Sequence, residues 1–306
     1  MSESVIEREL AARLAAIDWL TRQRAAGVEY WTHADLSLFT FDGTRIPLMD
    51  RQRGIRKPAG FDAALAIRTV FRPEGAMRPY EDGMGADGLL RYRWRGSDPN
   101  HPENRALRKA MERQVPIIWF EGFAPALYTA IAPVYLLAEE PERQQFVVAL
   151  GEDQLVLDVG GEVNSRRKRY VETMTKRRLH QPLFRAGVMH AYETRCAICA
   201  FRHGNLLDAA HITPDSTEDG VPATSNGLAL CKIHHGAYDA NIMGIRPDLV
   251  IEVRPDILEE IDGPMLKHGI QALHGEKLMM VPRSRRERPD EVRLEARYQQ
   301  FRTAPV

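Results

Sequence analysis

The sequence predicts an α+β protein with two domains, and three observations lead to this prediction. Its 306 residues exceed what one small hydrophobic core usually organises. The first half mixes helix-like and strand-like patterns, which is typical of a domain built around a sheet. All three cysteines lie in the second half, close to histidines, which indicates a separate metal-stabilised unit. We expect a sheet domain at 1–158, a helical connector at 159–192 and the metal-stabilised domain at 193–306.

Hydrophobic periodicity places the elements of the first domain. Apolar residues spaced three and four apart predict a helix over residues 5–24 that packs inside its own domain, and Thr32 is a candidate N-cap for a short helix over 33–38. "LFTFDGTRIPL" alternates around Asp42-Gly43, a strong signal for a two-residue hairpin. "GLLRYRWRG" predicts a strand, "NRALRKAMER" a helix, and "VPIIWFEGF" and "LYTAIAPVYLL" two further strands. Together these elements predict a curved, mostly antiparallel sheet.

The overall composition excludes several classes of protein. Lys and Arg together number 42, as do Asp and Glu, so the formal net charge is zero and gives no indication of a polyanionic partner. No apolar run is long enough for a membrane span, and the acidic start "MSESVIEREL" has no signal-peptide character, so we expect a cytoplasmic protein. Three cysteines, two of them in a Cys-x-x-Cys pair, suit metal binding or redox chemistry better than disulfides.

Basic residues concentrate in the connector. Residues 161–190 contain eight Lys or Arg and only two acidic residues. Such a segment can bind phosphates through counterion release, or it can be a solvated helix face. We expect this connector to be helical and interrupted at Pro182, and its basic side chains are the candidates for contacts with backbone phosphates: Arg166, Arg167, Lys168, Arg169, Lys176, Arg177 and Arg178.

The cysteines and one histidine have the spacing of a zinc site. "CAIC" provides Cys196 and Cys199, and "CKIH" provides Cys231 and His234. Two such pairs separated by a loop are typical of tetrahedral zinc with three thiolates and one imidazole. A redox pair is the alternative for an isolated Cys-x-x-Cys, but it would not need the second pair. We therefore expect a structural zinc ion.

The residues between and after the two pairs resemble a nuclease motif. His211, Asn226 and His235, interleaved with the zinc ligands, resemble the HNH motif. The segments "RLHQPLFRAGVMHAYETRCAIC", "LLDAAHITP", "NGLALCKIHHGAYD" and "LHGEKLMMVP" are similar to the C-terminal half of McrA-type restriction endonucleases. The resemblance covers roughly residues 178–301 and implies a zinc-stabilised ββα-metal nuclease domain.

The resemblance also implies roles in phosphodiester hydrolysis. His211 would be the general base, Asn226 would orient its imidazole, and His235 would bind a catalytic Mg²⁺ or Mn²⁺ ion. Many HNH proteins have an acidic metal ligand immediately before the general base, but this sequence has Ala210 there. Because Mg²⁺ prefers oxygen ligands, the missing carboxylate would come from Asp208 or Asp239, with Asp208 weakly favoured. Asp239 could equally be a surface residue.

The first domain is similar, more loosely, to the SRA-like domains of the PUA superfamily that precede HNH units in modification-dependent restriction enzymes. The segments that suggest this are "RGIRKPAGFDAALAIRTVF", "PYEDG", "YRWRGSDPNHPENRAL" and "VPIIWFEGFAPALYTAIAPVYL". The resemblance implies a reader that flips a base out of the duplex. The candidate base-binding residues are Tyr92, Trp94, Asp98, Tyr80 and Trp119. Alternating aromatic residues on a strand are also typical of a core, so that alternative stays open.

These observations together predict a modification-dependent DNA endonuclease that recognises methyl- or hydroxymethylcytosine in double-stranded DNA and takes part in restriction of foreign DNA. A homodimer is expected because two single-site subunits are needed to cut both strands. Two alternatives remain: an HNH endonuclease that acts on unmodified or structured DNA, and a zinc-stabilised DNA-binding regulator that does not cut. A zinc deaminase is excluded because no His-x-Glu accompanies a Pro-Cys-x-x-Cys.

Overall fold

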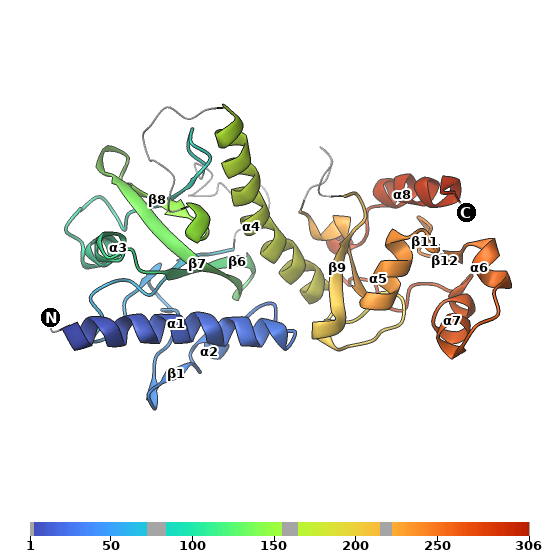
Figure 1. Ribbon diagram of the computed structural model, residues 1–306, viewed down its shortest axis with the longest axis horizontal. Helices are drawn as coiled ribbons and strands as arrows, with labels where there is room; N and C mark the ends of the chain where they lie inside the picture. The colour runs from blue at the N-terminus through green and yellow to red at the C-terminus, as the bar shows by residue number, and fades with distance from the viewer. Residues whose placement is uncertain (1–2, 72–83, 155–164, 215–221, 306) are drawn as a thin grey trace. The chain divides into compact units, whose positions relative to one another are not determined.

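The computed structural model describes residues 3–71, 84–154, 165–214 and 222–305. The chain divides into two compact units, which are described separately (Figure 1). Unit 1 comprises Met1–Arg24 and Glu29–Leu183, and unit 2 comprises Ala25–Val28 and Phe184–Val306. Within the described part of the chain, no helix has the length and apolar character of a membrane span.

Unit 1 is built on a six-stranded sheet that confirms the predicted α+β class. Its order is β3-β4-β6-β7-β8-β5. Only β4 and β6 pair in parallel, and the other neighbours are antiparallel. The strands are β3 (Ile55–Arg56), β4 (Ala66–Thr69), β5 (Leu90–Arg93), β6 (Ile117–Ala124), β7 (Leu127–Glu140) and β8 (Gln145–Ala149). The assignment of this sheet to the PUA superfamily stays a prediction.

One hydrophobic core holds α3 (Pro102–Glu112) against the sheet. The helix begins at His101, whose side chain accepts a hydrogen bond from the Glu103 backbone, and Pro102 occupies the first helical position. Leu107 is fully buried and belongs to the same core cluster as Val134 of β7 and Phe146 of β8. The predicted helix and strands of this region are therefore confirmed.

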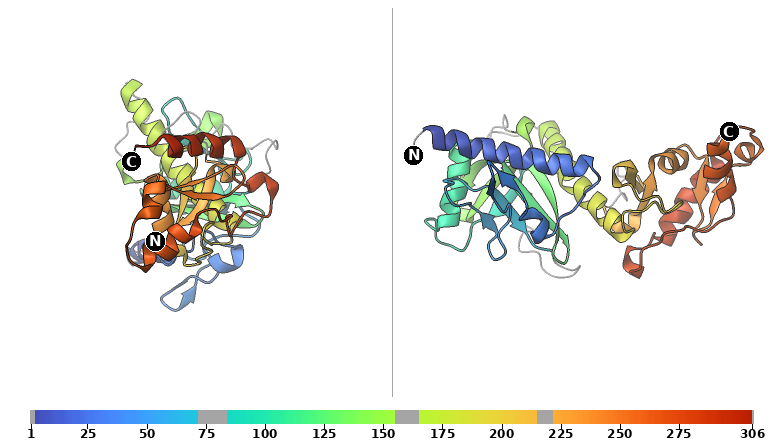
Figure 2. Two further views of the ribbon diagram at one scale, coloured as in Figure 1. Left: turned by 90° about the vertical axis from the view of Figure 1, so that its right-hand side faces the viewer. Right: turned by 90° about the horizontal axis from the view of Figure 1, so that it is seen from below.

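Helix α1 (Glu3–Ala25) lies along the sheet of unit 1, but the side that it buries differs from the predicted one (Figures 1 and 2). Ile6, Leu10 and Leu14 are 38–52% exposed, whereas Arg13 is completely buried. The Arg13 guanidinium donates to the carbonyls of Ala63 and Ala64 and pairs with Glu9 at 2.5 Å. Because both charges are paired and hydrogen-bonded, the helix can be anchored through a polar side.

The two predicted local signals near the N-terminus are confirmed. Thr32 caps α2 (His33–Leu36) in a capping box with Asp35. β1 (Thr40–Phe41) and β2 (Thr44–Arg45) pair antiparallel around a turn in which Asp42 and Gly43 have φ angles of 49° and 69°. Positive φ at both central residues is the geometry that makes Asp-Gly a hairpin signal.

Helix α4 (Ser165–Ala191) is continuous, which corrects the expected interruption at Pro182. A proline inside a helix removes one backbone hydrogen bond and strains the preceding turn. Packing on both sides of Pro182 offsets this cost, since Leu179 packs against the core of unit 1 and Phe184 is buried in unit 2.

Unit 2 contains two short hairpins surrounded by helices. β9 (Leu207–His211) pairs with β10 (Gly227–Cys231), and β11 (Met243–Ile245) pairs with β12 (Ile251–Val253), both antiparallel. The helices are α5 (Lys232–Asp239), α6 (Pro255–Glu259), α7 (Pro264–Gly269) and α8 (Glu291–Thr303). Short 3-10 turns complete the chain: η1 (Pro141–Arg143), η2 (Glu152–Gln154), η3 (Gly204–Leu206), η4 (Thr224–Asn226), η5 (Gln271–Leu273) and η6 (Arg285–Glu287).

Candidate active site and metal centre

Strands β9 and β10 and helix α5 form a compact ββα arrangement in unit 2. The strand register pairs His211 with Gly227 at one end and Leu207 with Cys231 at the other. Cys231 ends β10 and is the N-cap of α5, so the helix starts directly from the strand. This connection brings His234 and His235, on the first turn of α5, close to the residues of β9.

Cys196, Cys199, Cys231 and His234 form one cluster whose ligand atoms all lie within 4.8 Å of one another. The His234 Nδ1 atom lies 3.4 Å from the Cys196 sulfur and 3.2 Å from the Cys231 sulfur. In a tetrahedral zinc site with ordinary bond lengths, sulfur and nitrogen ligands lie about 3.5 Å apart. His234 Nε2 donates to the Gly269 carbonyl at 2.9 Å, which leaves Nδ1 as the ligand atom. The cluster therefore fits a zinc ion.

Hydrogen bonds among the four ligands shift the pKa values of the cluster. Burial alone would lower the pKa of His234, but hydrogen bonds to Cys196 and Cys231 raise it to about 10. Hydrogen bonds from Cys196 and Cys199 hold the pKa of the Cys231 thiol far below its ordinary range. A bound metal ion would displace the His234 proton and would take over its role as the positive charge beside the thiolates.

His235 lies between two carboxylates. Its Nδ1 is 3.1 Å from Asp208 Oδ2 and its Nε2 is 3.3 Å from Asp239 Oδ2. Asp208 also accepts a hydrogen bond from Lys232 at 2.6 Å and lies 3.5 Å from the Arg185 guanidinium. Burial would raise the pKa of Asp208, but hydrogen bonds from Lys232 and His235 hold it below its ordinary value. Both oxygens of Asp208 are therefore engaged, whereas the Asp239 side chain is 63% exposed.

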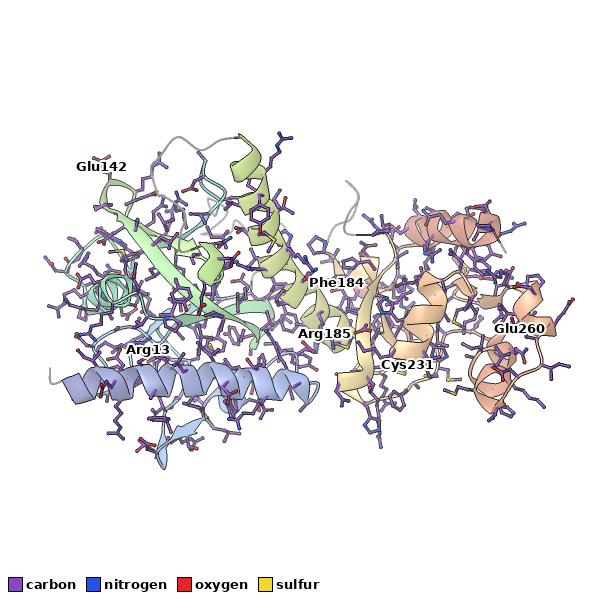
Figure 3. All side chains as sticks on the ribbon, in the orientation of Figure 1. Arg13, Glu142, Phe184, Arg185, Cys231 and Glu260 are labelled. Atoms are coloured by element: carbon purple, nitrogen blue, oxygen red, sulfur yellow. The ribbon has the colours of Figure 1, made fainter. Side chains whose placement is uncertain are left out.

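The other two residues of the motif lie at the His211 end of the hairpin. The His211 ring stacks on the Phe184 ring, with centroids 3.9 Å apart and planes 13° apart. Asn226 is completely buried, and its side-chain amide exchanges two hydrogen bonds with the backbone of Thr213, two residues after His211. Asn226 therefore fixes the backbone that leaves β9. Figure 3 shows Phe184 and Arg185 on the last turns of α4, on the side of unit 2.

The base-binding candidates of unit 1 are only partly accessible. Tyr92 and Trp119 are 2% and 6% exposed and pack edge-to-face in the core. Trp94 is half-buried against the same core, whereas Asp98 is exposed. Tyr80 lies outside the described residues. For Tyr92 and Trp119 the structure therefore corresponds to the core alternative, because neither ring has a free face for a base.

The arginines near these aromatic residues also differ in burial. Arg91 is 8% exposed and forms ion pairs with Asp87 at 3.0 Å and Glu140 at 2.9 Å, so it is committed to the core of unit 1. Arg93 and Arg95 are exposed.

Helix α4 carries the basic residues that are predicted to contact the DNA backbone, and these residues differ in exposure. Arg169, Lys176 and Arg177 are exposed. Arg178 instead donates to the Leu150 carbonyl at 2.6 Å and pairs with Asp153 at 2.6 Å. The side chains of Arg166, Arg167 and Lys168 lie outside the described part of the chain. Three of the predicted cations are thus exposed at the surface.

Sequence reasoning missed the contribution of α4 to the site. Phe184 and Arg185 contact His211 and Asp208. The sequence placed both residues in the predicted connector and in a segment similar to McrA-type endonucleases, but it indicated no role for either of them in the site. No short-range sequence pattern indicates that residues of α4 contact residues of β9, which lie more than 20 positions later in the chain. Lys232, which hydrogen-bonds Asp208, was likewise visible only as an isolated lysine.

Comparison with known proteins bears on unit 2 most directly. Residues 196–246 match the HNH endonuclease family. Two solved structures are similar to a large part of the chain. One is titled "Modification dependent TagI restriction endonuclease", with 17% identity over 84% of this chain and 88% of that chain, and a TM-score of 0.30. The other is the type IV phosphorothioation-dependent restriction endonuclease ScoMcrA, with 11% identity over 61% of this chain and 48% of that chain, and a TM-score of 0.23. No curated protein matches the sequence.

The matched segment contains the complete Cys/His cluster as well as His211, Asn226 and His235. The chain therefore carries an HNH endonuclease domain, the catalytic unit of a DNA endonuclease.

Proposed function

We propose that this protein is a modification-dependent DNA endonuclease in which unit 1 recognises a modified cytosine, methyl or hydroxymethyl, and unit 2 hydrolyses DNA phosphodiesters. The observation that carries the proposal is the ββα arrangement. His211 ends β9, Asn226 lies in the turn that precedes β10, and His235 lies on α5. The sequence resemblance of unit 1 to SRA-like domains supports a reader of modified bases that works by base flipping.

His211 is the general base in this proposal. A neutral imidazole has a pKa near the pH of the cell and can take a proton from the attacking water. The ring is held on one face by Phe184, and Asn226 holds the backbone that follows it. The chain thereby limits the motion of the base, which is a condition for efficient proton transfer.

The catalytic divalent ion is assigned to His235 and Asp239. Two ligands of one octahedral Mg²⁺ lie about 3 Å apart, and His235 Nε2 lies 3.3 Å from Asp239 Oδ2. Asp208 fits an orienting role better than the ligand role that we weakly favoured from the sequence, because Lys232 and His235 Nδ1 occupy its two oxygens. Such an ion, Mg²⁺ or Mn²⁺, would act as a Lewis acid on the phosphate and its leaving oxygen.

The zinc cluster would have a structural role. Its ligands connect the turn at Cys196 and Cys199 with the end of β10 and the first turn of α5. This connection sets the position of His235, which directly follows the ligand His234 in the sequence. Small units with little hydrophobic core often depend on such an ion for rigidity.

Unit 1 would be the reader of the modified base. With Tyr92 and Trp119 in the core, Asp98 and the half-buried Trp94 are the described candidates that would meet a flipped base. Asp98 offers a carboxylate that can accept a hydrogen bond from the cytosine amino group. The exposed cations Arg169, Lys176 and Arg177 on α4 would contact the DNA backbone. A homodimer would place two such sites on one duplex.

A cleavage assay on matched duplexes tests this proposal. The duplexes carry cytosine, methylcytosine or hydroxymethylcytosine at the same positions and are incubated with Mg²⁺ or Mn²⁺. We expect cutting only of a modified duplex and, in the His211→Ala variant, a rate lower by about 10²–10⁴-fold. Equal cutting of all duplexes would instead assign the protein to HNH endonucleases that ignore modification. Binding with no metal-dependent cutting of any duplex would support the non-cleaving regulator.

The two carboxylates are distinguished by their metal dependence. Asp239→Asn should raise the Mg²⁺ concentration that gives half-maximal cleavage, because it removes a charged ligand. Asp208→Asn should lower the maximal rate with a smaller change in that concentration, because it loosens His235 without removing a ligand. The reverse pattern would return the ligand role to Asp208.

A further inference from the structure

The closest ring contact of the HNH site comes from outside the ββα arrangement. Phe184, on α4, is 3% exposed and lies nearly parallel to the His211 ring at a centroid distance of 3.9 Å. No other aromatic pair recorded in the described part of the chain is this close. Since aromatic rings interact favourably in a parallel, offset arrangement, the contact restricts rotation of the imidazole about its side-chain bond.

The backbone of β10 leaves room for this ring. Gly227 is the register partner of His211, and a Cβ atom there would lie 2.9 Å from two atoms of the Phe184 ring and 2.4 Å from Val188. Real Cβ contacts are essentially never this short, so any larger residue would displace Phe184. The ring therefore occupies a niche formed by the His211 ring on one side and the bare backbone of Gly227 on another.

The neighbouring residue of α4 holds the other end of the same strand. Arg185 donates to the Leu207 carbonyl at 2.8 Å and lies 3.5 Å from Asp208, whose other oxygen contacts His235. Two consecutive residues of α4 thus contact both ends of β9. Helix α4 contributes to the geometry of the active site as well as connecting the chain.

We infer that Phe184 is a positioning residue for the general base: its ring holds the His211 imidazole in one plane and keeps water away from the stacked face. This inference rests on the proposed role of His211 in DNA hydrolysis. Water can then approach His211 only at the ring edge or on the opposite face. A loss of the planar contact should reduce the rate of the chemical step and leave DNA binding unchanged, because errors of about 1 Å in the placement of a reacting group can cost about 10²-fold in rate.

The test compares Phe184→Leu with Phe184→Tyr. Leucine keeps an apolar side chain but has no flat face, whereas tyrosine keeps the ring. Phe201→Leu is the matched control, because the Phe201 ring also contacts a histidine of unit 2, His203, but with centroids 4.9 Å apart and planes tilted by 48°. Single-turnover cleavage rates and DNA dissociation constants are measured for each variant on a duplex that the wild type cuts, whether modified or not. Loss of modification dependence would therefore contradict the proposed reader without affecting this comparison.

We expect Phe184→Leu to cleave at least about tenfold more slowly with a dissociation constant within about twofold of the wild type. Phe184→Tyr should restore most of the rate, and Phe201→Leu should match the wild type. A Phe184→Leu variant that cleaves at the wild-type rate would overturn the inference, as would a Phe184→Tyr variant that is as slow as Phe184→Leu.

A second measurement needs no DNA and is made chiefly on the wild-type protein. The chain has 10 histidines, and the His211 ring-proton resonances in the full-length wild type can be identified by their absence in His211→Ala. Protons that lie over the face of an aromatic ring are shifted upfield, so these resonances should lie upfield of those of exposed histidines and move downfield in Phe184→Leu. Resonances at ordinary positions in the wild type would show that the stack does not exist in solution and would overturn the inference.

Discussion

Removal of one zinc ligand should destabilise the nuclease site. In Cys231→Ala the perturbed residue is a ligand, the last residue of β10 and the N-cap of α5. Structural zinc contributes roughly 10–16 kcal/mol of apparent binding free energy in small zinc domains, or about 3 kcal/mol for each of four ligands. Folded domains are stable by only about 5–15 kcal/mol. The loss of about 3 kcal/mol should therefore lower the melting temperature of unit 2 by about 10 °C.

Three readouts test this expectation. Zinc content is measured with a chelating dye, thermal unfolding by circular dichroism, and the integrity of unit 2 by limited proteolysis. His268→Ala is the matched control, because His268 is an exposed histidine on α7 next to the zinc-supporting Gly269. A Cys231→Ala protein that keeps one zinc per chain and melts within about 2 °C of the wild type would refute the reasoning.

Four further predictions concern unit 1, the backbone of β10 and the zinc cluster. Arg91→Ala should destabilise unit 1 by about 3 kcal/mol in urea unfolding, because it leaves two carboxylates without their buried partner, whereas the exposed Arg93→Ala should have little effect. The pKa of one of these carboxylates, Glu140, is held below its ordinary value against the effect of burial by hydrogen bonds from Arg91 and Gln145, so its stabilising contribution should be lost as the pH falls below about 4. Gly227→Ala should cost about 1–3 kcal/mol through overpacking, whereas Gly236→Ala, with open space around its Cβ position on α5, should be neutral or stabilising by up to about 1 kcal/mol; thermal melts compare the two. Zinc affinity should rise with pH by about tenfold per unit for each proton released, since, against the effect of burial, the pKa of His234 is raised to about 10 by its hydrogen bonds to Cys196 and Cys231; chelator competition at two pH values measures the slope.

The parts of the fold that depend on short-range chemistry were predictable from the sequence. The capping box at Thr32, the Asp-Gly hairpin and the two Cys/His pairs each depend on residues a few positions apart, and all three are found in the structure. For the same reason, the sequence could indicate that His235 follows a zinc ligand and lies near a carboxylate.

The parts that depend on tertiary packing were not predictable. Alternating aromatic residues on a strand fit a core and a binding surface equally well, and only the assembled sheet places Tyr92 inside. On α1, Glu9 and Arg13 have the spacing of a solvent-exposed ion pair, but backbone groups from elsewhere in unit 1 make their burial favourable. The contact between Phe184 and His211 joins two distant segments without a sequence signal.

The most direct test of the account is the single-turnover cleavage rate of a methyl- or hydroxymethylcytosine duplex by the wild type and by His211→Ala, with DNA binding measured in parallel. The account predicts metal-dependent cutting by the wild type, a rate lower by about 10²–10⁴-fold in the variant, and equal binding by both. Equal cleavage by the two proteins would contradict the assignment of His211 as the general base of an HNH site.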